Sequence, residues 1–296
     1  MTESGALLES RFEVLPLGTP AEEAERLPER VKLTVTCSPR HGIDRSVEVA
    51  ERLAALGHQV VVHLAARMIR DGEHLDEVLG RFARAGMDDV FLIAGDAAQP
   101  LGPYASADEL LPVLAAHPHR PATIGIAGYP EGHPLVAPEV LAEVLERKSA
   151  LASYIVTQMC FDPKALERWV RETRARGVAL PVHVGIPGAV DRRKLLEISM
   201  RVGVGPSLKY VRKQRGLRKL LRPADATVAL HEALVDLAAE PGAGIVGLHF
   251  FTFNRLLETW QWAERHPVAA PTSPSAASSS RTIGSTSRPK RSTSSW

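Results

Sequence analysis

The chain has 296 residues, of which 45% are hydrophobic and 24% are charged, and its formal net charge is +2. This composition is typical of a globular protein, and the longest apolar runs are too short to cross a bilayer, so no membrane role is indicated. Four cations lie in a C-terminal tail without acidic residues, and without them the chain carries about −2. No concentrated basic face is therefore expected, which argues against nucleic acid as a partner.

The N-terminus and the cysteines indicate the compartment. The opening residues MTESGALLESRFEV place acidic residues where a signal peptide has a basic region, and they contain no long apolar stretch. The two cysteines, Cys37 and Cys160, lie in apolar segments without the spacing of metal ligands. We expect a cytoplasmic protein with reduced, buried thiols and no bound metal.

Short β-branched runs alternate with helical stretches along residues 1–266, which is the pattern of a parallel sheet with crossover helices. Several runs, such as VVVHLAA and VFLIAG, are apolar at almost every position, as expected for strands covered on both faces. The predicted strands are Arg11–Leu17, Lys32–Cys37, Gln59–Ala65, Val90–Asp96, Thr123–Tyr129, Tyr154–Cys160, Pro181–Ile186 and Gly244–Thr252. Because eight such units close a barrel, we predict an α/β fold, a (β/α)8 TIM barrel that forms one catalytic domain.

Amphipathic segments connect these strands. Apolar residues recur at helical spacing in DRSVEVAERLAALG, HLDEVLGRFARAG, APEVLAEVLERKSA and PKALERWVRETRARG. Gly57, Gly86 and Gly177 follow three of these segments at the position of a left-handed C-cap. The interval from Ile186 to Gly244 has room for two or three helices, so we predict an extra helical element between strands 7 and 8.

The last part of the chain, residues 267–296, consists mainly of Ser, Thr, Pro, Ala and Arg. Such a segment buries too little apolar surface to offset the entropy lost on ordering. We predict a disordered tail.

Polar residues gather at the C-terminal ends of the predicted strands, where the catalytic groups of an α/β barrel lie. They are Glu13, Thr36, His63, Asp96, Tyr129 with Glu131 and His133, Gln158, and His249. Any one of them alone is more often a satisfied structural group than a catalyst. Their convergence from seven strands favours one shared site at the mouth of the barrel.

These residues belong to the motifs RFEVLP, LIAGD, GYPEGHP, LERK ahead of YIVTQMCFD, and HFFTFNR. As an ordered set, from about Phe12 to Arg255, they resemble the methylenetetrahydrofolate reductase family. The resemblance implies an oxidoreductase of one-carbon metabolism and methionine biosynthesis, in which NAD(P)H reduces 5,10-methylenetetrahydrofolate to 5-methyltetrahydrofolate through FAD. We also expect a homo-oligomer.

The resemblance implies a role for each matching residue. Glu13 would be the general acid that helps to open the five-membered ring of the substrate to an iminium ion, since a partly desolvated carboxyl group has a raised pKa. Asp96 would lie beside the flavin and the pterin and tune the flavin potential. FAD would be bound by Thr36, His63, Gly95, Asp96, Tyr129, His133 and Lys148, and the folate by Gln158 and Arg255.

Four positions depart from the family pattern. Ala94 replaces an arginine, Cys37 an aromatic residue and Phe251 a tyrosine, and Leu141 stands where an acidic residue often lies. Two alternatives therefore stay open. The same fold could run oxidatively on methyltetrahydrofolate in C1 catabolism or with another electron donor, or the chain could be a non-catalytic barrel subunit that regulates a partner enzyme. The presence of Glu13 argues against the non-catalytic alternative.

Overall fold

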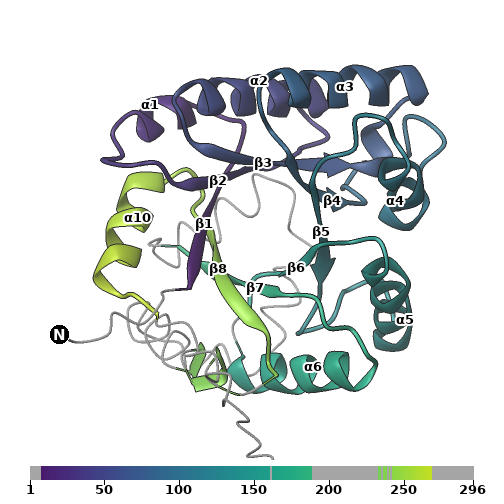
Figure 1. Cartoon of the computed structure of the whole chain (residues 1–296), viewed down its shortest axis with the longest axis vertical. Helices are drawn as coiled ribbons and strands as arrows, with labels where there is room; N and C mark the ends of the chain where they lie inside the picture. Colours follow the sequence, from purple (N-terminus) through teal and green to yellow (C-terminus); the bar gives the residue numbers. More distant parts are fainter. Residues whose placement is uncertain are drawn as a thin grey trace, which may run out of the picture.

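The computed structural model describes residues 8–160, 162–188, 233–234, 236–238, 240 and 242–268. In this part of the chain, parallel strands follow one another in sequence order and close into a barrel, with the last strand paired to the first. The strands are β1 (Glu9–Val14), β2 (Lys32–Val35), β3 (Gln59–Ala65), β4 (Asp89–Ile93), β5 (Thr123–Gly128), β6 (Tyr154–Thr157), β7 (Val182–Pro187) and β8 (Ile245–Phe251). Figure 1 shows them as a ring surrounded by helices, which confirms the predicted (β/α)8 TIM barrel.

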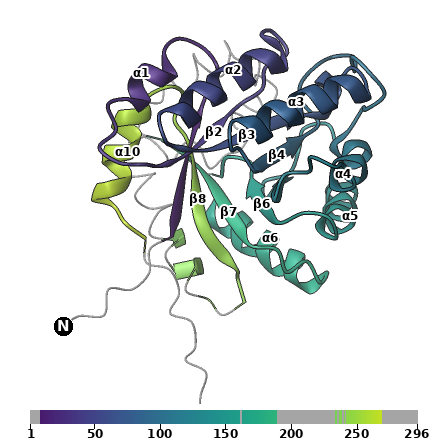
Figure 2. The ribbon, with the colours of Figure 1, turned by 45° about the horizontal axis from the view of Figure 1, so that its top comes forward.

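The helices lie outside this ring. They are α1 (Pro20–Ala24), α2 (Gly42–Ala55), α3 (Gly72–Arg84), α4 (Ala107–Ala115), α5 (Pro138–Ser149), α6 (Pro163–Ala175) and α10 (Leu256–Arg265), with the short 3-10 helix η1 (Ala66–Met68) after β3. Gly57, Gly86 and Gly177 have φ of +88°, +68° and +82°, so the predicted left-handed residues after α2, α3 and α6 are confirmed. Asp71 and Asp162 cap α3 and α6 by accepting hydrogen bonds from backbone N–H groups. Figure 2 shows the same layers from a tilted view.

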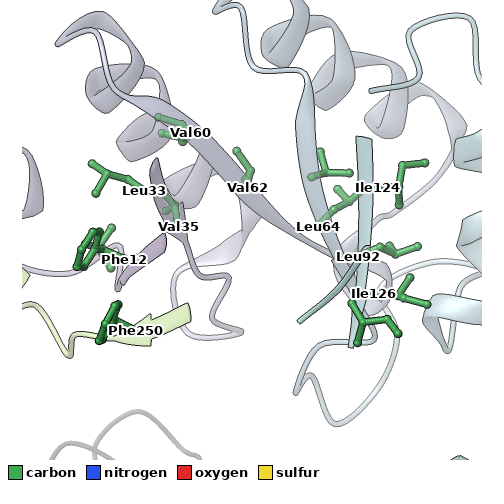
Figure 3. Packing of buried hydrophobic residues seen from close by; sticks show 14 of the residues in the cluster. Phe12, Leu33, Val35, Val60, Val62, Leu64, Leu92, Ile124, Ile126 and Phe250 are labelled. Atoms are coloured by element: carbon green, nitrogen blue, oxygen red, sulfur yellow. The ribbon is translucent and has the colours of Figure 1, made fainter. Parts of the chain in front are cut away.

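The main hydrophobic core lies between the barrel and the helices. Side chains alternate along each strand, and the outward positions are apolar. Phe12 of β1 stacks on Phe250 of β8 with ring centroids 5.2 Å apart. Figure 3 shows the two side chains next to each other. Phe250 also meets the ring of Trp262 in α10, at a centroid distance of 6.1 Å. This packing joins the first strand, the last strand and the last helix.

The inward positions near the N-terminal ends of the strands carry charges. Lys32 Nζ lies 2.9 Å from Asp89 Oδ2, and Arg11 and Glu9 complete an ionic cluster of four residues. The Tyr154 hydroxyl donates to Asp89 Oδ1 at 2.7 Å, and the Arg11 guanidinium lies over the Tyr154 ring. These side chains pair with one another at that end of the barrel, whereas the catalytic groups of this fold lie at the opposite end.

Some predictions fall outside the described residues. The extra element between β7 and β8 lies mainly in residues 189–232, and the predicted tail from residue 269 onward is likewise outside them. Cys37 and Cys160 are free thiols, Cys160 buried and Cys37 half-buried. Among the helices described, none is both long and apolar enough to cross a membrane.

Candidate active site

Three ionisable side chains meet inside the barrel near the carboxyl ends of its strands. They are Glu13 of β1, His63 of β3 and His249 of β8, called here the acid–histidine cluster. Glu13 faces inward because its neighbours Phe12 and Val14 face the outer core. Glu13 Oε2 lies 3.1 Å from His249 Nε2 and 3.7 Å from His63 Nε2. All three side chains are buried.

Burial sets the protonation of this cluster. Burial raises the pKa of Glu13 to about 7, and the interaction with His63 offsets part of the rise. Burial also lowers the pKa of His63 to about 4 and, together with the charge of Arg11, that of His249 to about 3. At neutral pH both imidazoles are therefore neutral, while a large share of Glu13 is protonated. The cluster can hold a transferable proton, as a general acid must.

A backbone clasp holds β1 against the loop after β8. The carbonyl oxygen of Glu13 accepts hydrogen bonds from the hydroxyl and the N–H of Thr252, at 2.5 and 3.3 Å. Asn254 accepts a bond from the N–H of Leu15 and donates to the carbonyl oxygens of Leu15 and Leu17. Phe253 and Asn254 have φ of +51° and +59°, a left-handed conformation that costs energy in residues other than glycine. The clasp therefore fixes the acid at considerable conformational cost.

A second group of predicted residues follows β4 and β5. Asp96 is exposed after β4, and Tyr129 and His133 follow β5. The Tyr129 and His133 rings pack edge to face with centroids 5.2 Å apart. Burial and the charge of Asp96 raise the pKa of Tyr129, whereas burial lowers the pKa of His133 and Asp96 partly offsets that change. The structure thus brings these three residues together.

Gly95, Thr36 and Gln158 lie directly after their strands, at the same rim. Gly95 has φ of +85°, and a Cβ atom there would lie 2.8 Å from Ala65 Cβ, so the backbone at Gly95 packs closely against β3. The N–H of Thr36 donates to the carbonyl oxygen of Val14, which sets Thr36 beside the end of β1. Gln158 is exposed, and its side-chain oxygen accepts a bond from the N–H of Met159.

Arg255 lies at the start of α10 and Lys148 at the end of α5. Arg255 follows β8 as the N-cap of α10 and pairs with Glu258. Lys148 is buried in the last turn of α5, where burial lowers its pKa and Asp108 offsets part of the change. Because α5 runs from the mouth back to the start of β6, Lys148 lies in the outer layer, away from the strand ends. Its role toward FAD stays a prediction.

Two features that position the site were not predicted. The Arg67 guanidinium in η1 donates to the carbonyl oxygens of Ala97, Ala98 and Ala105, and it thereby orders the loop that carries Asp96. The other feature is the clasp of Thr252 and Asn254. Its only sequence signal is the polar pair inside HFFTFNR, which says nothing about a contact with β1.

The acid–histidine cluster also has donor atoms for a metal ion, all within 4.8 Å of one another. A metal-binding histidine normally donates its other ring N–H to an acceptor. His249 Nδ1 is buried and has no hydrogen-bond partner among the residues described. The cluster is therefore better suited to proton transfer than to metal binding.

Comparison with known families agrees with the motifs. The family described as "Methylenetetrahydrofolate reductase" matches residues 22–262. The matched range begins after Glu13, so the assignment of the acid depends on the geometry and on the RFEVLP motif.

Curated relatives bear the same name. Methylenetetrahydrofolate reductase 1 of Schizosaccharomyces pombe is 26% identical over 198 aligned residues, which cover 62% of this chain and 31% of the relative. Methylenetetrahydrofolate reductase (NADH) 1 of Arabidopsis thaliana is 26% identical over 298 aligned residues, which cover 86% of this chain and 47% of the relative. The chain thus spans less than half the length of these relatives.

One solved structure shares most of the fold. It is described as "Uncharacterized protein from Clostridium thermocellum binds two copies of 5-methyl-5,6,7,8-tetrahydrofolic acid". It has a TM-score of 0.60 and 13% identity, over 87% of this chain and 96% of that one. At this identity the likeness supports the barrel fold.

Proposed function

Because this chain belongs to the methylenetetrahydrofolate reductase family, we propose that it is a flavoenzyme in which NAD(P)H reduces 5,10-methylenetetrahydrofolate to 5-methyltetrahydrofolate through FAD. The observation that carries the proposal is Glu13, a buried carboxyl group near the carboxyl end of a barrel strand, with its pKa raised to about 7. The A. thaliana relative is named for NADH, and the C. thermocellum protein binds a methylated folate. Both names agree with the proposed substrates.

Glu13 would act on the folate before the hydride arrives. A protonated Glu13 donates its proton to a ring nitrogen of the substrate, the five-membered ring opens, and the resulting iminium carbon becomes the hydride acceptor. Near neutral pH the acid is present in both protonation states, so it can give up a proton and regain one. A carboxyl group with an ordinary pKa would be almost fully ionised there.

The residues that would hold FAD are Thr36, His63, Gly95, Asp96, Tyr129, His133 and Lys148. Except for Lys148, they lie in or directly after β2 to β5, on neighbouring strands of one rim. They offer hydroxyl, imidazole, carboxylate and backbone groups, a set that suits the polar edge of a flavin, whereas Lys148 lies in the last turn of α5, away from this rim. Bound FAD would supply two-electron chemistry, accepting hydride from NAD(P)H and passing it to the folate. Gln158 and Arg255 would then contact the folate.

The first test is an absorbance spectrum of the purified protein, before and after NADH is added without oxygen. The proposal expects a yellow protein whose flavin bands bleach. Glu13→Gln should lose folate reduction by roughly 100-fold to 10,000-fold, because it removes the proton donor, while NADH still bleaches the flavin. Glu51→Gln, which removes a carboxylate paired with Arg81 on the outer helices, is the matched control and should keep full activity.

Other results would contradict the proposal. A colourless protein without affinity for FAD would remove the cofactor from it. Equal loss of flavin reduction and folate reduction in Glu13→Gln would show that Glu13 supports the fold or the flavin rather than the protonation step.

An oxidative enzyme is the second candidate. The departures at Ala94 and Leu141, and the methylated folate bound by the C. thermocellum protein, favour oxidation of methyltetrahydrofolate. Steady-state rates in both directions with NADH, NADPH and reduced ferredoxin separate the two. A non-catalytic subunit, the remaining alternative, would show no turnover in either direction and would change the rate of a partner enzyme.

A further inference from the structure

We propose that His249 is the positioning residue of the acid. Its Nε2–H donates to Glu13 Oε2 and so leaves the opposite oxygen, Oε1, as the proton-bearing atom that faces the mouth of the barrel. The inference depends on the proposed role of Glu13 as general acid and adds to it the residue that decides which oxygen delivers the proton.

The strand register sets the direction of this contact. In the pairing of β1 with β8, Glu13 lies opposite Phe251, and His249 lies two residues earlier on the same inward face. His249 therefore approaches the carboxyl group from the inner side of the barrel rather than from the mouth. Among the residues described, no group hydrogen-bonds to Glu13 Oε1.

The two histidines are not equivalent. Both Nε2 atoms face Glu13 Oε2, but the 3.1 Å separation from His249 is a hydrogen bond and the 3.7 Å separation from His63 is not. His63 Nε2 is buried without a hydrogen-bond partner in the described part of the chain. The ring of His249 packs edge to face on that of Phe251 with centroids 5.0 Å apart, and its centroid lies 6.4 Å from that of His63. His249 is thus the partner with a fixed geometry.

The hydrogen bond favours proton donation. While Glu13 is protonated at Oε1, Oε2 is a carbonyl oxygen that accepts from the neutral imidazole. After the proton moves from Oε1 to the substrate nitrogen, Glu13 is a carboxylate, and the same N–H bond becomes stronger because its acceptor is charged. His249 neither gains nor loses a proton in this step. It stabilises the product state of the acid, so its loss should raise the pKa of Glu13 above the value in the intact protein.

The test titrates Glu13 in the purified protein without folate or NAD(P)H. Infrared difference spectra report the carbonyl stretch of a protonated carboxyl group, and Glu13→Gln identifies the band of Glu13. His249→Phe should raise the Glu13 titration by about one to two pH units, the worth of a hydrogen bond to a charged group. His249→Gln, which retains an N–H donor, should restore most of the shift. His183→Phe, at another buried barrel histidine, is the matched control and should leave it unchanged.

A second measurement needs no variant. Nitrogen-15 NMR of the histidine rings should find His249 as the neutral tautomer with its proton on Nε2 across the neutral range. The tautomer with the proton on Nδ1 would overturn the proposal, as would an unchanged Glu13 titration in a folded His249→Phe. Cobalt(II) that binds the wild type with visible absorption bands, lost in both Glu13→Gln and His249→Phe, would also overturn it and assign the cluster to a metal.

These outcomes are distinct from failure of the proposed function. If the protein binds no FAD and turns over no folate, the proton on Glu13 and the tautomer of His249 can still be measured. If the enzyme is active and His249→Phe has the pH profile of the wild type, the proposed function stands and the positioning role does not.

Discussion

The two ends of the barrel interior hold buried carboxyl groups in opposite surroundings. At the N-terminal end, Asp89 lies 2.9 Å from the Lys32 ammonium and accepts a hydrogen bond from Tyr154. At the C-terminal end, the polar partners of the Glu13 carboxyl group among the described residues are the imidazoles of His63 and His249, and burial keeps both neutral. A carboxyl group beside a fixed cation forms an ion pair that stabilises the fold, whereas a buried carboxyl group among neutral rings can carry a proton. The two acids thus differ in their partners. We call the end that holds Asp89 the structural end and the end that holds Glu13 the chemical end.

The largest expected effect comes from removing the Asp89 carboxylate at the structural end. Asp89→Ala leaves Arg11 and Lys32 with Glu9 as their remaining acidic partner in the described structure, and Glu9 is 42% exposed. Removing one partner of a buried ion pair typically costs about 3 to 5 kcal/mol, so the free energy of unfolding should fall by that order. Chemical denaturation measures it. Asp89→Asn, which retains an acceptor for Tyr154, should lose less, and equal losses would show that charge is not what matters there.

A smaller effect on stability is expected from ionising Glu13 at the chemical end. Glu13 has a raised pKa, so its favourable contribution to folding is complete below its ordinary pKa of 4.5 and is lost as the pH rises through about 7. The free energy of unfolding of the wild type, relative to Glu13→Gln, should therefore fall by about 3 kcal/mol between pH 4.5 and pH 7. Urea unfolding of both proteins across this range measures the difference. If the difference in the free energy of unfolding does not change with pH, Glu13 must contact water or a cation.

The smallest expected effect comes from removing the hydroxyl group of either of two threonines. Thr252→Val removes the hydroxyl that donates to the carbonyl oxygen of Glu13, and it should cost about 1 kcal/mol of stability. Thr34→Val is the matched control, since the Thr34 hydroxyl is buried without a hydrogen-bond partner among the described residues. Removing an unsatisfied buried hydroxyl should leave stability unchanged or raise it. Thermal unfolding of the two variants tests this, and equal losses would exclude the clasp as a source of stability.

Much of the fold could be predicted because parallel strands that are covered on both faces have a strong local signal. VVVHLAA and VFLIAG lie in β3 and β4 as expected. Helices α1 and α4 were not singled out. The first has only five residues, and α4 has nine with Pro112 inside it and apolar residues on most sides, so neither shows a clear amphipathic period.

The part of the candidate site that lies at the ends of the strands was predictable from the sequence. Glu13, Asp96, Tyr129 and His133 could be named because they end or follow buried runs, and the barrel brings such positions to one rim. The ionic cluster could not be predicted, because Arg11 and Lys32 look like ordinary charges at the start of a strand. The contact of His249 with Glu13 was also hidden, since it depends on the register between the first and last strands. Periodicity along the sequence carries no information about that register.

The clasp between β1 and β8 has a consequence for the order in which the protein is made. Glu13 and His249 are 236 positions apart, and the ribosome synthesises the acid well before its partner. Until the last strand docks, the Glu13 carboxyl group faces water and ionises like any exposed glutamate. The chain therefore acquires a buried Glu13 carboxyl group with a raised pKa only in the step that pairs β8 with β1.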